Sequence, residues 1–215
     1  LITGDNDHYI RFWHEISWSN IGFDYARDQA ELSRKKWFPQ SKGGDYRKWF
    51  GNNETVVNWS NDGHELQTRM HSSGNRILAH NFNLDKIFLK SITWTKISSG
   101  TLSARLQPSG FLFDDASANA FPDSDAFVNP LLAFLISKIP VIALQALNPT
   151  LNFLPGNISS LPVPSEMLQS VKVANITDKA VKITITDWDS YETSWDFTTL
   201  PLLRPEHRRD TLAAS

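Results

Sequence analysis

Length, composition and charge narrow the class of protein before any motif is considered. The chain has 215 residues, of which 40% are hydrophobic and 20% charged, so we expect a globular protein with a hydrophobic core and exclude a disordered one. It has no cysteine, which excludes disulfides, thiolate metal sites and cysteine nucleophiles and favours a cytoplasmic origin. The net charge of −2 excludes a globally basic protein, while eight tryptophans exceed ordinary usage.

The first part of the chain predicts short strands and helices in alternation. Residues 9–17 are strand-like, and residues 24–36 have a helical composition that ends in basic residues, as suits the negative end of a helix dipole. A β-branched run at 55–59 predicts a short strand, and residues 61–70 predict a helix.

Strands dominate the middle of the chain. Residues 91–114 predict two or three strands, over 91–98, 101–107 and 111–114, separated by turns at Ser99-Gly100 and at Pro108-Gly110. Between Lys86 and Phe113 there are four basic residues and no acid. A sided charge distribution of this kind suits a polyanion partner within a neutral total.

An apolar run at 127–147 raises the question of a membrane segment. Lys138 and Pro140 lie near its middle, and a central lysine costs about 2.5–3.5 kcal/mol on insertion scales. We therefore expect a buried helix over 131–147 and no membrane contact.

Prolines before Ser165 predict the start of a further helix at that residue. The whole pattern predicts an α+β fold, with a mixed or mainly antiparallel sheet and packed helices. We expect one domain over residues 1–186 and an acidic linker or tail over 187–215.

One segment, "KWFPQSKGGDYRKWFGNNETVVNW" at 36–59, combines six aromatic residues, four basic residues and three glycines. Two partner classes combine flat rings with polar groups. Nucleic acid requires cations for phosphate and rings or amides for bases, whereas carbohydrate requires rings, carboxylates and amides. A carbohydrate-binding module and a protein-interaction domain therefore stay open as alternatives. We expect the rings themselves to pack in the core, namely Trp37, Phe38, Trp49 and Trp59.

Motifs for catalysis are missing from the sequence. The six histidines show no metal-ligand spacing, so we expect no metal site. No nucleophile, base and orienting group stand in a recognisable arrangement, and we expect no catalytic residues in this chain.

Five blocks in chain order resemble one family. They are "TGDNDHYIRFWHEI", "KWFPQSKGGDYRKWFGNNETVVNW", "ITWTKISSGTLSARLQPSGFLFD", "LNPTLNFLPGNISSLPVP" and "DWDSYETSWDFTTLPLL". Together they resemble the PglX family of BREX phage-defence systems, which are adenine-specific DNA methyltransferases related to restriction-modification enzymes. The resemblance implies a target-recognition region similar to the specificity domain of TaqI-like methyltransferases. It also implies that residues 148–164 form the closing segment of such a domain, a hydrophobic hairpin that docks against the sheet.

The resemblance also implies what this chain lacks. The family methylates the N6 of adenine with S-adenosylmethionine, through an Asn-Pro-Pro-Tyr/Phe motif and a glycine-rich cofactor loop. Neither motif occurs here, because Asn129-Pro130 and Asn148-Pro149 are followed by Leu131 and Thr150. Since the chain begins at Leu1 without a methionine, we expect a piece of a longer enzyme that binds no cofactor itself. Its expected partners are double-stranded DNA, the catalytic domain of the parent chain and other defence-system proteins.

The expected DNA contacts follow from residue chemistry. Basic side chains suit phosphates, a glycine pair lets main-chain N–H groups approach them, and asparagine amides suit adenine edges. Along the strand 91–98 we expect the face with Lys96, rather than the face with Thr93, to point to solvent or DNA. Arg105 is expected to read a guanine. The complete set is Lys36, Lys42, Gly43, Gly44, Arg47, Lys48, Asn52, Asn53, Lys90, Lys96, Ser98, Ser99 and Arg105.

Overall fold

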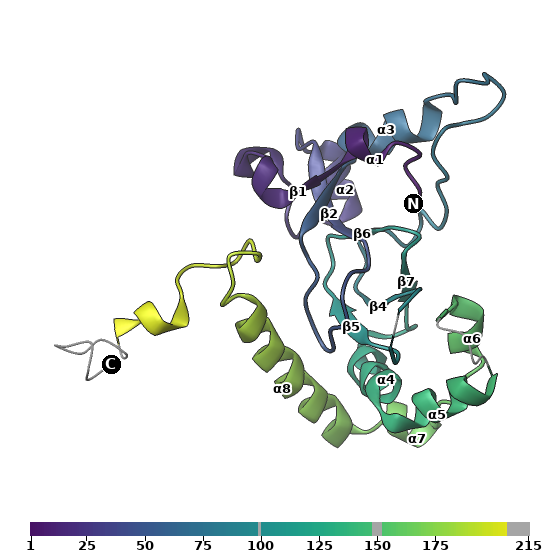
Figure 1. Ribbon diagram of the computed structural model, residues 1–215, viewed down its shortest axis with the longest axis vertical. Coiled ribbons are helices and arrows are strands. Elements are labelled where there is room, and N and C mark those ends of the chain that lie inside the picture. Colours follow the sequence, from purple (N-terminus) through teal and green to yellow (C-terminus); the bar gives the residue numbers. More distant parts are fainter. Residues whose placement is uncertain (99, 148–151, 206–215) are drawn as a thin grey trace.

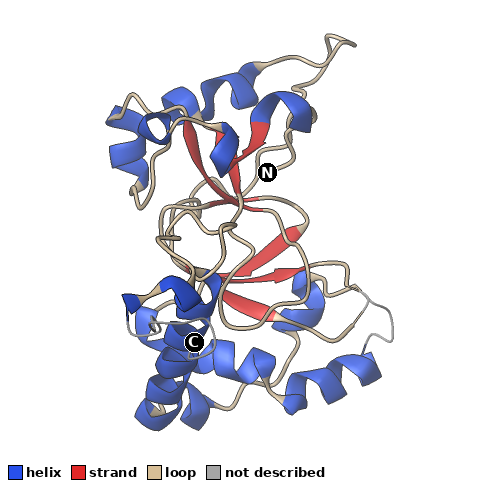
Figure 2. Cartoon of the chain, turned by 60° about the vertical axis from the view of Figure 1, so that its left-hand side comes forward, coloured by secondary structure: helices blue, strands red, loops and turns tan. Residues whose placement is uncertain are grey.

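Two lobes, each built around its own β-sheet, make up the body of the molecule. The structure is a computed structural model that describes residues 1–98, 100–147 and 152–205. Figure 2 shows the two sheets one above the other, with helices on the outer side of each. The predicted α+β class, with mixed or antiparallel sheets, is confirmed, although the strands form two sheets rather than one.

The first lobe contains a four-stranded sheet in the order β1-β3-β2-β6 (Figure 1). β1, β3 and β2 pair antiparallel, and β6 pairs parallel with β2. The strands are β1 (Ile10–Phe12), β2 (Trp37–Ser41), β3 (Thr55–Asn58) and β6 (Leu112–Phe113). The helical segments of this lobe are α1 (Asn6–Tyr9), η1 (Trp13–Glu15), η2 (Trp18–Asn20), α2 (Arg27–Leu32) and α3 (Ser60–Thr68).

The second lobe contains a three-stranded antiparallel sheet in the order β5-β4-β7. Its strands are β4 (Ser91–Thr95), β5 (Ala104–Gln107) and β7 (Ser117–Ala120). The helices that cover it are α4 (Asp125–Ile136), α5 (Lys138–Leu147), α6 (Pro155–Ser159), α7 (Ser165–Leu168) and α8 (Val171–Trp188), and η3 (Pro201–Leu203) follows them. The predicted strands at 91–98 and 101–107 correspond to β4 and β5, which pair antiparallel, with Ser91 opposite Gln107 and Trp94 opposite Ala104.

Aromatic rings from the segment 36–59 pack inside the protein, as predicted. Trp37, Phe38 and Trp59 are buried in the first lobe. Phe38 and Val57, which lie opposite each other on β2 and β3, are fully covered. Trp49 is half-buried and packs against the core of the second lobe. The unusual tryptophan content therefore serves the two cores to a large extent.

Strand β4 is buried on both faces, which corrects the expectation for Lys96. The face that carries Lys96 also carries Trp94, which is 2% exposed and packs in the core with Leu132 of α4. Thr93, on the opposite face, is 1% exposed. Both faces are covered because helices lie on one side of this sheet and the first lobe lies on the other.

The two lobes meet through hydroxyl groups. Thr93 Oγ1 lies 3.2 Å from Ser41 Oγ and 2.7 Å from Ser117 Oγ, and it also donates to the Ala118 carbonyl oxygen at 3.1 Å. We call Ser41, Thr93 and Ser117 the hydroxyl seam. Because buried polar groups are stable only when hydrogen-bonded, this set of contacts defines how β2 sits against β4 and β7.

The apolar run at 131–147 forms two helices rather than the single one expected. The helix breaks at Ser137, whose backbone is extended, and α4 and α5 meet there with a bend of 62°. A proline inside a continuous helix clashes with the carbonyl four residues before it; the break places Pro140 in the first turn of α5, where this clash disappears. Within the described residues, no single helix is long and apolar enough to cross a membrane.

Several other boundaries differ from the prediction. The expected strand at 9–17 is a strand only over Ile10–Phe12, between two helical turns. The expected helix at 24–36 is only six residues long, because the chain must become extended again to enter β2 at Trp37. Of the expected hairpin at 148–164, residues 148–151 lie outside the described part of the chain, and the remainder contains helix α6.

The segment after α8 returns to the first lobe. The expected boundary at 186/187 falls inside α8, whose last residue, Trp188, is 6% exposed. The Trp195 ring lies 5.0 Å from the ring of Phe23 and 5.8 Å from the ring of Phe111, and Trp13 Nε1 donates to the Thr193 carbonyl oxygen. The chain is therefore attached to the body as far as Trp195, and residues 196–205 extend outward (Figure 1).

Candidate nucleic-acid interface

The loop between β2 and β3 is shaped by glycine. We call residues 42–54 the glycine loop. Gly43 and Gly44 have φ angles of +86° and +112°, a region that residues with a side chain rarely adopt. A Cβ atom on Gly44 would lie 2.8 Å from Asn52 Nδ2, which donates to the Asp45 carbonyl oxygen. The loop is docked onto the second lobe by Thr95 Oγ1, which donates to the Gly44 carbonyl oxygen at 3.0 Å.

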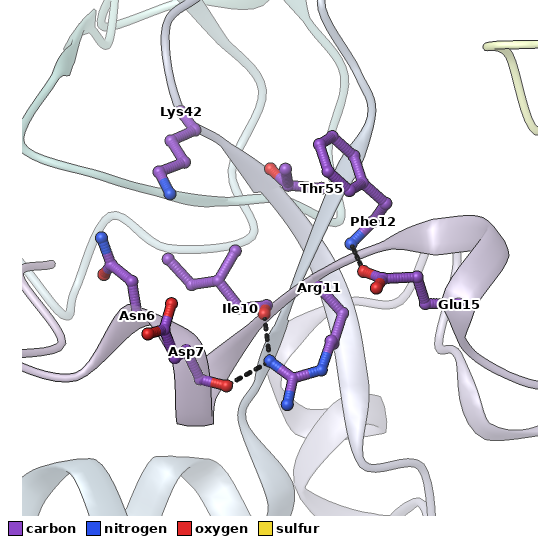
Figure 3. A pocket seen from close by; sticks show the side chains of 8 residues that line it. All are labelled: Asn6, Asp7, Ile10, Arg11, Phe12, Glu15, Lys42 and Thr55. Carbon is purple, nitrogen blue, oxygen red and sulfur yellow. Dashed lines mark hydrogen bonds between the residues drawn. The ribbon is translucent and has the colours of Figure 1, made fainter.

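A surface groove runs between this loop and strand β1. One hollow of about 360 Å³ is lined by Phe12, Lys42, Gly43, Gly44, Asp45, Asn52, Glu54 and Thr55. A second, of about 310 Å³, is lined by Asn6, Asp7, Ile10, Arg11, Phe12, Glu15, Lys42 and Thr55 (Figure 3). Because they share three lining residues, we treat the two hollows as one site and call it the Phe12 groove. It brings together four of the expected DNA contacts: Lys42, Gly43, Gly44 and Asn52.

The two cations of the groove differ in availability. Arg11 is occupied, because its Nη1 donates to the main-chain carbonyls of Ile10 and Asp7 (Figure 3). Lys42 extends from the end of β2 toward Asn6 and Asp7 (Figure 3). Among the described residues, its ammonium makes no ion pair or hydrogen bond. Lys42 is therefore the cation that a ligand in the groove would meet.

Acids outnumber bases along the groove. Its charged lining residues are the bases Arg11 and Lys42 and the acids Asp7, Glu15, Asp45 and Glu54. The Glu15 carboxylate is occupied, since it accepts from the Phe12 main-chain N–H at 2.7 Å. The carboxylates of the other three acids have no hydrogen-bond or ion-pair partner within the described part of the chain. The groove lining therefore offers hydrogen-bond acceptors rather than a positive electrostatic potential.

Arg47, one of the expected contacts, is engaged with helix α8 instead. Its Nη2 lies 2.6 Å from Asp187 Oδ2, and its Nε donates to the Phe50 carbonyl oxygen at 3.0 Å. The guanidinium lies over the Trp188 ring, 4.9 Å from its centroid. These contacts fasten the glycine loop to the end of α8. By contrast, Lys36 is exposed over the Trp37 ring, and Lys48 lies over the exposed Tyr46 ring.

Arg105 is not at the surface, contrary to the expectation. It is 1% exposed, because it lies opposite Thr93 on the face of the second sheet that meets the first lobe. Among the residues that the structure describes, its Nε and Nη1 have no hydrogen-bond partner. Desolvation, together with the nearby charge of Arg47, lowers the pKa of Arg105 to about 10. A side chain in this position cannot touch a base, and we remove Arg105 from the candidate contacts.

The remaining expected contacts are scattered. Asn53 is 3% exposed, and its Oδ1 accepts from Gln107 Nε2 at 3.4 Å. Lys96 is paired with Asp115 at 2.9 Å and lines a neighbouring hollow that shares Asn6 with the Phe12 groove. Lys90 and Ser98 are half-buried, and Ser99 lies outside the described residues. Among the described residues, no group of three or more histidine or acidic side chains is placed to hold a metal ion.

The sequence reasoning missed the β1 side of the groove. Phe12 is 48% exposed at the end of an edge strand, and Asp7 and Thr55 lie beside it in the groove. The signal that could have found it was Phe12 next to Arg11 in a short strand. An exposed aromatic side chain next to a basic residue is common where a protein contacts a ligand.

Comparison with known proteins shows which proteins the chain resembles. Over nearly its whole length, the chain is similar to part of two bacterial adenine-specific methyltransferases. The adenine-specific methyltransferase PglX of Lacticaseibacillus casei (strain Zhang) is 39% identical over 212 residues, which are 98% of this chain and 17% of that protein. The adenine-specific methyltransferase BrxX of Escherichia coli O9:H4 (strain HS) is 33% identical over 208 residues, which are 96% of this chain and 16% of that protein.

The chain therefore corresponds to a segment of a PglX-family protein, as the resemblance of its sequence blocks indicated. It spans about one sixth of the length of these relatives. No protein-family model matches the sequence.

Proposed function

We propose that this chain is the DNA target-recognition segment of an adenine-specific methyltransferase in a BREX-type phage-defence system. An enzyme that methylates particular adenines needs a surface that selects them. The observation that carries the proposal is the Phe12 groove, in which an available lysine, a glycine pair, an asparagine and an exposed ring converge. Transfer of the methyl group, with S-adenosylmethionine as donor, belongs to a catalytic domain elsewhere in the parent chain.

The proposed mode of binding separates positioning from reading. Lys36 and Lys48 are cations on the segment that carries the groove, and they suit phosphates, which fix the register of a protein on DNA. Lys42 stands at the groove itself. The interior of the groove, with its carboxylates and the Asn52 amide, suits base edges, which carry the sequence information.

A second candidate function rests on the chemistry of the groove lining. An exposed ring beside unpaired carboxylates and amides also suits a sugar, so a carbohydrate-binding site is the alternative. The two are distinguished by retention of the purified chain on heparin and on insoluble glycans. Salt-sensitive retention on heparin supports DNA binding, and retention on glycans alone supports the alternative.

An exchange of segments tests target recognition directly. In the chimera, this chain replaces the matching 212-residue segment of the L. casei relative. We expect this chimera to methylate the DNA site of the parent enzyme from which the chain comes. The reason is that the segment that reads bases decides which adenine is presented. Methylome sequencing of cells that carry the chimera gives the site, and the reciprocal chimera is the control. Methylation of the recipient's original site by both active chimeras would rule out the proposal.

Lys42→Ala tests the role of the available cation. We expect weaker binding to duplex DNA and a plot of log affinity against log salt whose slope is shallower by about 0.9, since one phosphate contact is lost. Fluorescence anisotropy over a salt series measures both. The matched control is Lys182→Ala on α8, where the lysine is paired with Asp178. Equal slopes for the wild type and Lys42→Ala would show that Lys42 meets no phosphate.

A further inference from the structure

We infer that the Phe12 groove holds a single unstacked nucleobase that carries an exocyclic amino group, and that Phe12 is its stacking surface. This inference rests on the proposed function and adds the chemical class of the ligand in the groove. It concerns side chains that the reasoning from sequence did not single out.

Phe12 is held in place as a platform. Its ring stacks on that of His14, with the centroids 5.6 Å apart and the planes 8° from parallel. Its main-chain N–H is fixed by the Glu15 carboxylate. The side chain is nevertheless 48% exposed and lines both hollows of the groove. A ring that is supported on one face and open to a groove is suited to stack on a second flat ring.

The charges of the groove favour a base over a phosphate. The carboxylates of Asp7, Asp45 and Glu54 repel a phosphate, and they have no partner among the residues that the structure describes. A carboxylate accepts hydrogen bonds only, so it matches the amino groups of adenine, cytosine and guanine. Thymine has no such group. The Lys42 ammonium is left for a phosphate, as proposed above.

The base must be out of its stack to use this surface. Inside a duplex both faces of a base are covered by its neighbours, so a protein ring can stack only on an extruded or single-stranded base. We therefore expect the chain to prefer DNA with an unpaired base over a perfect duplex. We also expect adenine or cytosine at the unpaired position to be bound more tightly than thymine.

Phe12→Leu separates stacking from mere apolar contact, because leucine keeps an apolar side chain without the ring. The probe is a duplex with one unpaired 2-aminopurine, whose fluorescence reports stacking, and the affinity is measured in parallel by anisotropy. We expect Phe12→Leu to weaken binding of this probe at least fivefold and to abolish the fluorescence change, since stacking of one base accounts for about fivefold to a hundredfold in affinity. Phe12→Tyr should behave as the wild type.

Trp18→Leu is the matched control, because Trp18 is 55% exposed but lies outside the groove. Equal affinity and fluorescence of the wild type and Phe12→Leu would overturn the inference. Competition for the probe by soluble glycans, but not by DNA with unpaired bases, would also overturn it. If Phe12→Leu has no effect while salt-dependent duplex binding persists, only this inference fails. If the wild type binds no DNA of any form, the proposed function fails as well.

Discussion

Replacing Trp94 by alanine is expected to lower the free energy of unfolding by about 3–5 kcal/mol, the largest effect of any single substitution considered. Trp94 is 2% exposed at the centre of the second lobe, where it packs with Leu132 and Phe134 of α4. Its Nε1 donates to the Phe153 carbonyl oxygen at 2.7 Å, which holds the segment before α6 against β4. The variant leaves both a large cavity and a buried carbonyl without its donor. Urea unfolding followed by circular dichroism measures the loss.

Two further variants separate the causes. Trp94→Phe keeps most of the apolar contact and removes the indole N–H, so we expect a loss of about 1–3 kcal/mol from the unpaired carbonyl and the smaller ring. Trp18→Ala, at a ring that is 55% exposed, should change the stability by much less. A loss under 1 kcal/mol for Trp94→Ala would contradict the packing described for β4.

Arg105→Met is expected to stabilise the protein by about 1–4 kcal/mol, a gain opposite in sign to most core substitutions. The Arg105 guanidinium is buried, and two of its nitrogens have no hydrogen-bond partner within the described part of the chain. The charge that acts on it is another cation, Arg47. Methionine fills similar space without a charge. Arg105→Lys is the control, because it keeps the charge in the same place and should bring no gain. A lower free energy of unfolding for Arg105→Met would show that the cation has a stabilising partner.

The gain should depend on pH in a defined way. Burial lowers the pKa of Arg105 to about 10, so the penalty of the charge is fully present at neutral pH. As the pH rises above about 10, the folded state loses the proton before the unfolded state does, and the penalty fades. The difference in stability between Arg105→Met and the wild type should therefore be constant up to pH 9 and narrow above pH 10. The methylated site should stay the same in a parent enzyme with Arg105→Met.

Local signals in the sequence predicted much of the fold. Strands β4 and β5 follow from two runs of strand-forming residues around a turn, and the burial of the rings in 36–59 follows from their size. Long-range pairing was not predictable. No local signal indicates that β6, only two residues long, pairs in parallel with β2 of the first sheet rather than with the preceding strand β5. Arg105 was wrongly placed at the surface for the same reason. Its side of β5 is interior only because the second sheet packs against the first lobe.

The candidate site was predicted in part for a similar reason. The glycine pair and Lys42 are neighbours in the chain, so their composition alone indicated a loop with a binding role. Phe12 and Asp7 reach the same groove from β1 and α1, which are brought there by the pairing of Phe12 with Thr55 across the sheet. Residues that are brought together by strand pairing cannot be recognised from their spacing along the chain.

The chain alternates between the two lobes, so the coding sequences of the lobes are interleaved in the gene. After building the first lobe it forms β4 and β5 of the second, returns to add β6 to the first sheet, and then leaves again for β7 and the helices. Trp195 finally comes back to Phe23 and Phe111. No single crossover between two related genes can therefore exchange one lobe and leave the other intact. Recombination that exchanges the Phe12 groove together with its supporting cores must carry the whole interleaved segment as one cassette, from before β1 to beyond Trp195.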